Sequence, residues 1–220
     1  MLRNGPPEVT KTLVIEKELG LLSIARKRSK GLKLTDILVT IVIAIVFGLI
    51  YRIWGPVYDV VKLVGLQAEQ LTYGMWFIAA TVAFLLIRKP GVALLAEVAA
   101  ASGELLTGSQ YGVESLTYGI MQGIGAELIF ALFAYRSYSL VTACLAGIGA
   151  GLGALAMDAY KGYLLELQGW NLTLYLVFRF IGCIVITGGF AYYLVKALEA
   201  TGVTRIVRPV SDADRQGLHD

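Results

Sequence analysis

The chain alternates long apolar runs with short polar connections. Six runs are apolar and long enough to be read as helices that cross about 30 Å of hydrocarbon. They extend over Leu34 to Trp54, Gln70 to Ile87, Gly91 to Leu106, Ser115 to Ala134, Ser139 to Met157, and Asn171 to Lys196. The third run is the shortest, and the basic, proline-containing turn RKPG marks its start. This pattern predicts an all-α membrane protein, a compact bundle of six transmembrane helices over residues 34–199.

The flanking segments are more polar than the bundle. Residues 1–33 form a basic segment that we expect either to lie on the membrane surface as an amphipathic helix or to be disordered, and residues 200–220 form a short tail. Only 16% of the 220 residues are charged and 57% are hydrophobic, whereas a soluble domain has about 25% charged residues. The length leaves no room for a separate soluble catalytic domain, so the function must lie among the helices.

Basic residues predict the orientation. They precede the first run, form the connection between runs two and three, recur at Arg136, and follow the last run, and all these positions belong to one side of the membrane. Because cytoplasmic loops carry an excess of Lys and Arg, both termini are predicted to be cytoplasmic.

Polar side chains inside the apolar runs are the strongest functional signal. Glu97 and Glu104 are seven residues apart, which places them on one helix face about 10 Å apart along the axis. A charge at the bilayer centre costs about 2.5–3.5 kcal/mol even on lenient scales, so such a face is expected to line a cavity. Three other runs also bring polar or aromatic residues to their outer halves. The candidate ligand-binding residues are Tyr73, Trp76, Glu97, Glu104, Glu114, Tyr118, Gln122, Asn171 and Tyr175.

Two further charges lie deeper in the runs. Glu127 is about 20 Å along the helix from Glu114, and Arg179 is at a comparable depth in the last run. We expect them to form a structural ion pair or to take part in coupling. The tyrosines and tryptophans near the outer ends of the runs are interpreted as an interfacial aromatic belt, and they are Trp54, Tyr58, Tyr111, Tyr160, Tyr163 and Trp170.

Small residues recur at four-residue spacing in several runs. The stretch Gly147 to Gly153 reads GIGAGLG, which is typical of closely packed membrane helices. Ala44 and Gly48 form another such pair in the first run, which has no polar stripe, so this face is predicted to be an external docking surface for a partner.

The residue types indicate the class of ligand. Aromatic rings beside carboxylates and amides suit a flat, positively charged heteroaromatic molecule, such as thiamin or its aminopyrimidine precursor, although other organic cations would also fit. The only histidine is His219, which excludes histidine-based metal sites and nucleophiles, and no metal site is predicted. An intramembrane enzyme is therefore disfavoured.

Several motifs resemble one transporter family. The runs YGMWF, IRKPG, AE with GELLTG, and QGIGAEL are similar to those of the YkoE-type substrate-binding S components of energy-coupling factor (ECF) transporters, over roughly Gly55 to Val203. The resemblance implies a non-enzymatic, multi-pass protein of the prokaryotic cell membrane that captures thiamin or hydroxymethylpyrimidine from outside. It also implies a transmembrane coupling protein and two ATP-hydrolysing ABC-type subunits as partners, with Ala44 and Gly48 at the docking position.

The resemblance also implies roles for particular positions. The residues that match the family pattern are Tyr73, Trp76, Glu97, Glu104, Gln122, Glu127, Asp158 and Arg179. No cofactor is expected in this chain itself, and the absence of a GxxxxGK[ST] motif places ATP hydrolysis on other subunits. The alternative is a self-sufficient proton- or sodium-coupled carrier for an organic cation, in which Glu127 and Arg179 would form the coupling relay.

Overall fold

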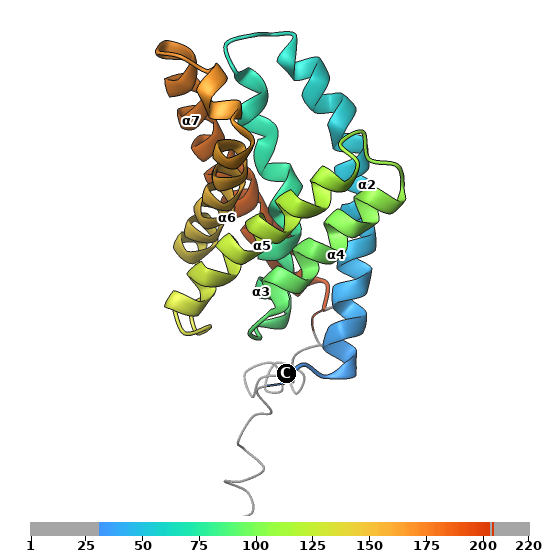
Figure 1. Ribbon diagram of the computed structural model, residues 1–220. Coiled ribbons are helices and arrows are strands. Elements are labelled where there is room, and N and C mark those ends of the chain that lie inside the picture. The colour runs from blue at the N-terminus through green and yellow to red at the C-terminus, as the bar shows by residue number, and fades with distance from the viewer. Residues whose placement is uncertain (1–30, 203, 205–220) are drawn as a thin grey trace, which may run out of the picture. The chain divides into compact units, whose positions relative to one another are not determined.

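The computed structural model describes residues 31–202 and Thr204, and within these residues every regular element is helical. In chain order the elements are α2 (Leu34–Lys62), the 3₁₀ helix η1 (Ala68–Phe77), α3 (Ile78–Ile87), α4 (Val92–Leu106), α5 (Val113–Leu132), α6 (Leu140–Lys161), the 3₁₀ turn η2 (Tyr163–Glu166), α7 (Trp170–Gly182), the π-helical η3 (Cys183–Phe190) and α8 (Ala191–Ala200) (Figure 1). Almost all of the basic segment 1–33 and most of the tail 200–220 lie outside the described residues.

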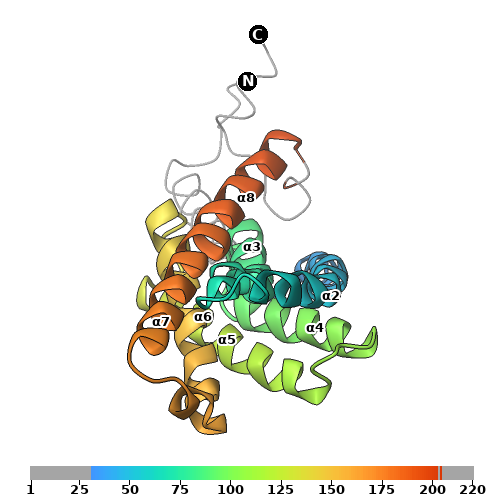
Figure 2. The ribbon, with the colours of Figure 1, turned by 90° about the horizontal axis from the view of Figure 1, so that it is seen from above.

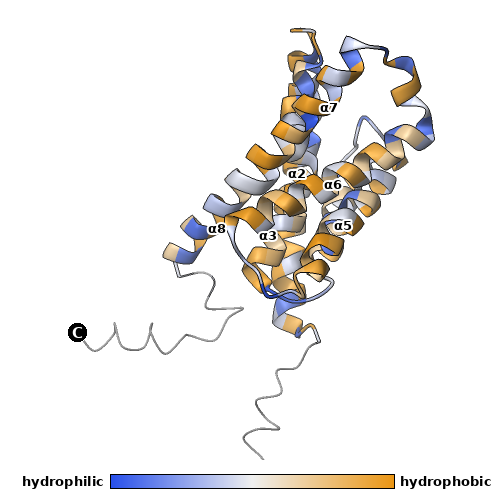
Figure 3. Cartoon of the chain, turned by 90° about the vertical axis from the view of Figure 1, so that its left-hand side faces the viewer, coloured by the Kyte–Doolittle hydropathy of each residue, from blue (hydrophilic) through white to orange (hydrophobic). Residues whose placement is uncertain are grey.

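Five continuous helical stretches are long and apolar enough to cross a membrane. They are Leu34–Lys62, Ala68–Ile87, Val113–Leu132, Leu140–Lys161 and Trp170–Ala200. The predicted third run corresponds to α4, which has 15 residues and is only about 22 Å long at 1.5 Å per residue. The six predicted runs are therefore all helical and occur in the predicted order, with α4 the shortest. Hydrophobic residues cover most of the middle of the bundle (Figure 3).

Helix α3 is the centre of the bundle. All ten of its residues are buried, and the view along the bundle shows the other helices around it (Figure 2). Phe84 of α3 stacks on Phe130 of α5, with 3.7 Å between ring centroids. Since α3 follows η1 without an intervening loop, the packing of this central helix also fixes where η1 lies.

The first helix is longer than its apolar run predicts. The sequence Trp54-Gly55-Pro56 indicates a stop, but α2 continues through Pro56 to Lys62. Proline lacks the N–H donor of a helix interior, and here the helix tolerates it. The extension carries Tyr58 and Lys62 past the end of the predicted span.

Glycines allow α5 and α6 to pack at very short range. A Cβ placed on Gly125 would lie 2.0 Å from the carbonyl oxygen of Gly149, and one on Gly153 would lie 2.1 Å from that of Met121. The alternating pair, Gly147 and Gly151, faces η3 instead. A Cβ on Gly147 would lie 2.6 Å from the carbonyl oxygen of Cys183. The prediction of close helix packing along Gly147 to Gly153 is confirmed, and the two pairs serve two different neighbours.

Ala44 and Gly48 also pack inside the bundle. Ala44 is 5% exposed, and a Cβ on Gly48 would lie 3.0 Å from the carbonyl oxygen of Ala100 and 3.1 Å from the Cα of Gly103, both on α4. The external docking surface predicted from this pair is therefore wrong: the small residues bring α2 against α4.

Candidate ligand-binding site

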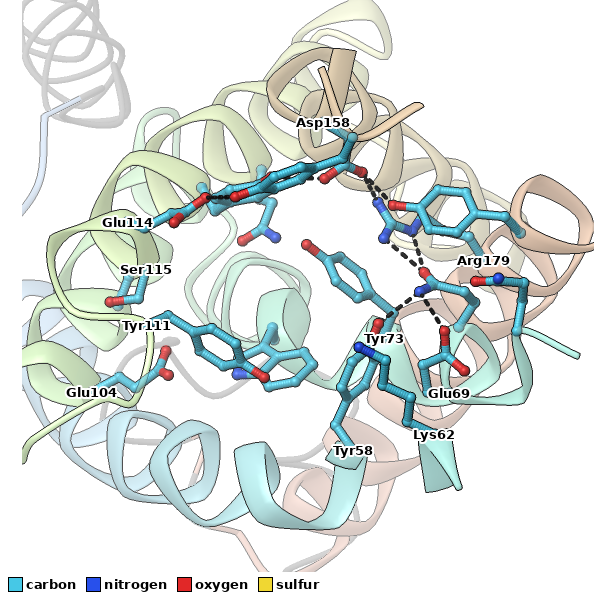
Figure 4. Close-up of a pocket in the computed structure, with 18 of the residues that line it drawn as sticks. Tyr58, Lys62, Glu69, Tyr73, Glu104, Tyr111, Glu114, Ser115, Asp158 and Arg179 are labelled. Atoms are coloured by element: carbon cyan, nitrogen blue, oxygen red, sulfur yellow. Dashed lines mark hydrogen bonds and ion pairs between the residues drawn. The ribbon is translucent and has the colours of Figure 1, made fainter. Parts of the chain in front are cut away.

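A cavity of about 460 Å³ lies at the end of the bundle where α2 ends and α7 begins, called here the cavity end. Side chains from α2, η1, α4, α5, α6, η2 and α7, and from the loops beside them, surround it (Figure 4). They are Tyr58, Lys62, Gln67, Glu69, Gln70, Tyr73, Trp76, Ala101, Glu104, Tyr111, Glu114, Ser115, Tyr118, Gln122, Asp158, Tyr163, Leu167, Tyr175 and Arg179.

A buried ion pair forms one wall. Arg179 is 1% exposed, and its Nη1 pairs with Oδ2 of Asp158. The same carboxylate accepts hydrogen bonds from the hydroxyls of Tyr118 and Tyr175, each at 2.7 Å. Because both phenols donate to Asp158, their oxygens can act toward a ligand only as acceptors.

Gln70 extends this network to the opposite wall. Its Oε1 accepts from Nε and Nη2 of Arg179 at 2.8 and 2.7 Å, and its Nε2 donates to the Tyr58 hydroxyl at 2.6 Å. The guanidinium also lies over the ring of Tyr73, 3.7 Å from its centroid. Arg179 thus links η1, α6 and α7, and its charge and donors are used by the protein.

Aromatic rings form the second wall. Trp76 lies 5.0 Å from Tyr58, 5.5 Å from Tyr73 and 5.7 Å from Tyr111, measured between ring centroids, and all three contacts are edge-to-face. Edge-to-face pairs are favourable and hold the rings in fixed orientations. These rings give a flat ligand a rigid apolar surface.

Glu104, like Glu69, is a lining carboxylate that forms no ion pair within the described residues, whereas Glu114 and Asp158 are paired. Oε1 of Glu104 accepts from Ser109 Oγ at 2.8 Å, and within the described residues no Lys or Arg lies within ion-pair distance of it. The buried indole N–H of Trp76, close to this carboxylate, makes no hydrogen bond of normal geometry in the described part of the chain. An acceptor and a donor thus stand side by side.

The rim carries a second, more exposed acid. Glu114 Oε1 accepts from the Tyr163 hydroxyl at 3.1 Å and pairs with Lys161 Nζ at 3.3 Å. The hydrogen bond to Glu114 raises the pKa of Tyr163, and burial raises the pKa of Tyr111. Both phenols therefore remain neutral at physiological pH.

The lining has four carboxylates and two basic side chains, which favours cationic over anionic ligands. Within the described residues, no group of three or more His, Cys, Asp or Glu side chains is arranged to hold a metal ion.

Comparison with known proteins decides the family. The putative HMP/thiamine permease protein YkoE of Bacillus subtilis (strain 168) is 35% identical over 176 residues, which cover 79% of this chain and 88% of the relative. A crystal structure of an S-component of an ECF transporter superimposes with a TM-score of 0.76 at 33% identity, over 80% of this chain and 89% of that one. The chain is a YkoE-like ECF S component. The family model described as "ABC-type cobalt transport system, permease component" also matches residues 35–153.

Most of the predicted site residues meet in the cavity of this S component. The lining includes Tyr73, Trp76, Glu104, Glu114, Tyr118, Gln122, Tyr175 and Arg179. Asn171 does not, because it lies in the first turn of α7 and its side chain is exposed.

Glu97 does not line the cavity either. It is 0% exposed, and its Oε2 accepts from the Tyr51 hydroxyl at 3.0 Å and from the backbone N–H of Ala80 at 3.2 Å. The face that it shares with Glu104 reaches the cavity only toward the end of α4, at Ala101 and Glu104. The expectation that both glutamates contact a ligand is therefore wrong for Glu97.

The predicted ion pair between Glu127 and Arg179 is also wrong. Glu127 accepts from the backbone N–H groups of Gly91 at 2.6 Å and Leu94 at 3.1 Å. These amides belong to the first turn of α4, where N–H groups have no partner inside the helix, so Glu127 of α5 caps α4. Arg179 pairs with Asp158 instead. The family resemblance includes Asp158, but the predicted fifth run ends one residue before it, at Met157.

Several lining residues of this S component were not predicted as site residues. Tyr58, Tyr111 and Tyr163 were interpreted as an aromatic belt, but they line the cavity. Gln70 begins the second predicted run and Glu69 directly precedes it, close in sequence to Tyr73. That proximity was the available signal for both residues. Lys62 had no such signal, because it lies beyond the apparent end of the first run.

Proposed function

We propose that this S component captures thiamin or hydroxymethylpyrimidine in its cavity, from outside a prokaryotic cell, for ATP-driven import by partner subunits. The observation that carries the proposal is the lining, which combines a wall of aromatic rings with an excess of carboxylates. Rings stack on a flat heterocycle, and carboxylates favour a cation and accept from an amine. The name of the B. subtilis relative supports the same ligands.

Trp76 and Glu104 suit the edge of an aminopyrimidine. Such an edge presents an amine donor beside a ring nitrogen acceptor. The Glu104 carboxylate would accept from the amine. The indole N–H of Trp76, which is close to Glu104 and makes no hydrogen bond of normal geometry within the described residues, would donate to the ring nitrogen. A 4-oxo analogue of thiamin has the opposite pattern and is expected to bind at least tenfold more weakly.

The distribution of basic residues supports an outward-facing cavity. Arg88 and Lys89 lie between α3 and α4, Arg136 lies between α5 and α6, and Lys196 lies near the end of α8. All are at the opposite end of the bundle from the cavity. Since basic loops stay in the cytoplasm, both ends of the helical region would be cytoplasmic and the cavity would open outward.

Glu104→Gln and Trp76→Ala are each expected to weaken thiamin binding by more than tenfold. The first removes the charge that faces the amine and the second removes a ring and a donor. Isothermal titration of the purified variants measures the effect, and Glu166→Gln is the matched control, because Glu166 is exposed near the cavity end and outside the lining. Unchanged affinity in both site variants would remove this assignment.

Energy coupling is tested separately in proteoliposomes. The chain alone is expected to bind thiamin without transporting it, and uptake should require a coupling protein, two ATPase subunits and ATP. Uptake by the chain alone under a proton or sodium gradient would instead support a self-sufficient carrier. The relay suggested for such a carrier has lost its basis, since Glu127 caps α4 and Arg179 pairs with Asp158.

A further inference from the structure

The second membrane crossing changes its helix type in the middle. Residues Ala68–Phe77 form a 3₁₀ helix and Ile78–Ile87 form an α-helix, and Phe77 between them has φ −140° and ψ 20°. These angles are outside the helical range. The first amides of α3 therefore lack partners in their own helix, although they are buried in the bundle.

Two side chains from neighbouring helices supply the missing acceptors. The Tyr51 hydroxyl of α2 accepts from the Ala79 N–H at 3.0 Å, and Oε2 of Glu97 of α4 accepts from the Ala80 N–H at 3.2 Å. The Tyr51 hydroxyl in turn donates to Glu97 Oε2 at 3.0 Å. Both side chains are at most 1% exposed, so water does not compete for these contacts.

The residues that this junction holds include two of the main cavity residues. Trp76 comes directly before Phe77, and Tyr73 lies one 3₁₀ turn earlier. Both line the cavity. A 3₁₀ helix has three residues per turn and an α-helix has 3.6, so moving the point of change by one residue would rotate Trp76 about the helix axis.

We propose that Glu97, together with Tyr51, is a positioning residue that fixes the point where η1 becomes α3 and thereby aims Trp76 and Tyr73 into the cavity. The affinity part of this inference rests on the proposed function. The placement of Trp76 does not, because it concerns the unliganded protein.

Glu127 provides a matched control inside the same bundle. Like Glu97, which accepts from the Ala80 amide, it caps the start of a helix, and it does so by accepting from two backbone amides. The helix that it caps, α4, contributes Ala101 and Glu104 to the cavity from its far end only. Removing Glu127 therefore removes a comparable cap without touching η1.

The test compares Glu97→Leu, Glu97→Gln and Glu127→Leu. Glutamine keeps an oxygen that can replace Oε2, since Oε1 of Glu97 makes no hydrogen bond in the described part of the chain. Titration with thiamin and hydroxymethylpyrimidine is expected to show at least tenfold weaker binding for Glu97→Leu. Glu97→Gln and Glu127→Leu should stay within about threefold of the unchanged protein.

A ligand-free readout separates this inference from the proposed function. Protein labelled with 5-fluorotryptophan contains three reporters, Trp54, Trp76 and Trp170, which ¹⁹F NMR resolves and single Trp→Phe variants assign. Glu97→Leu is expected to shift or broaden the Trp76 signal, and Glu127→Leu to leave it unchanged. If the wild-type protein binds neither ligand, the proposed function fails. The NMR result still tests the positioning role of Glu97 in that case.

Two results would overturn the inference. In the first, Glu97→Leu lowers thermal stability as Glu127→Leu does but changes neither the Trp76 signal nor the affinity. Glu97 would then be a structural cap only. The second is equal damage by Glu97→Gln and Glu97→Leu. Should Glu97→Leu fail to fold, Tyr51→Phe removes only the bridging hydroxyl, and it must then shift the Trp76 signal for the inference to stand.

Discussion

Gly125→Ala is expected to prevent the bundle from packing. The added methyl group would lie 2.0 Å from the carbonyl oxygen of Gly149 and 3.1 Å from the Cα of Ala150, and both are backbone atoms that no rotamer change can move away. Overpacking a well-packed core costs about 1–3 kcal/mol and sometimes more. Because α5 and α6 must separate along their whole contact to relieve this clash, we expect the upper part of that range or beyond.

Thermal unfolding in detergent, followed by size-exclusion chromatography, measures the effect of Gly125→Ala. Gly189→Ala is the matched control: Gly189 is also inside a helix, and its added Cβ would have only an ordinary contact of 3.6 Å with the carbonyl oxygen of Ile184. A Gly125→Ala protein as stable as Gly189→Ala would mean that the close approach of α5 and α6 is not as described.

Arg179→Met is expected to abolish ligand binding and to destabilise the bundle. It would leave Asp158, 3% exposed, as a buried charge without its cation, and removing one partner of a buried ion pair costs about 3–5 kcal/mol. Gln70 would lose both donors to its Oε1, and Tyr73 would lose the cation over its ring. Two walls of the cavity would thus lose their link, and we expect thiamin affinity to fall more than a hundredfold.

A double variant separates the two consequences of Arg179→Met. Adding Asp158→Asn removes the orphaned charge, and it should recover part of the lost stability without recovering binding, because Gln70 and Tyr73 still lack their partner. Thermal unfolding and titration of the single and double variants form the cycle. A double variant less stable than Arg179→Met alone would show that the Asp158 charge is not the main cost.

The helical runs could be predicted from hydropathy, but the change of helix type could not. An apolar run in a membrane protein looks the same whether its backbone is α-helical or 3₁₀, so nothing around Phe77 marks the junction. The extension of α2 beyond Trp54 could not be predicted from the sequence either. Gly55 and Pro56 usually end a helix, and only the tertiary structure shows that the helix continues to Tyr58 and Lys62.

The candidate site could be predicted only in part. Helical spacing gives the direction in which a side chain points, but neither its depth in the bundle nor its partner. Glu97 and Glu104 share a face of α4, yet only Glu104 is near enough to the cavity end to line it. Glu127 was paired with Arg179 on depth alone, whereas it turns toward the start of α4. Tyrosines such as Tyr111 serve equally well in an interfacial belt or a binding wall, so their role required the structure.

The central claim is that this single chain binds an aminopyrimidine vitamin or precursor in its cavity, with no partner and no ATP. Isothermal titration of the purified protein with thiamin and hydroxymethylpyrimidine, with thiamin pyrophosphate as an anionic comparison, tests it most directly. We predict saturable one-to-one binding of at least one of the first two ligands, and at least tenfold weaker binding of the pyrophosphate because the lining is rich in carboxylates. No binding of either ligand, or tighter binding of the pyrophosphate, would contradict the account.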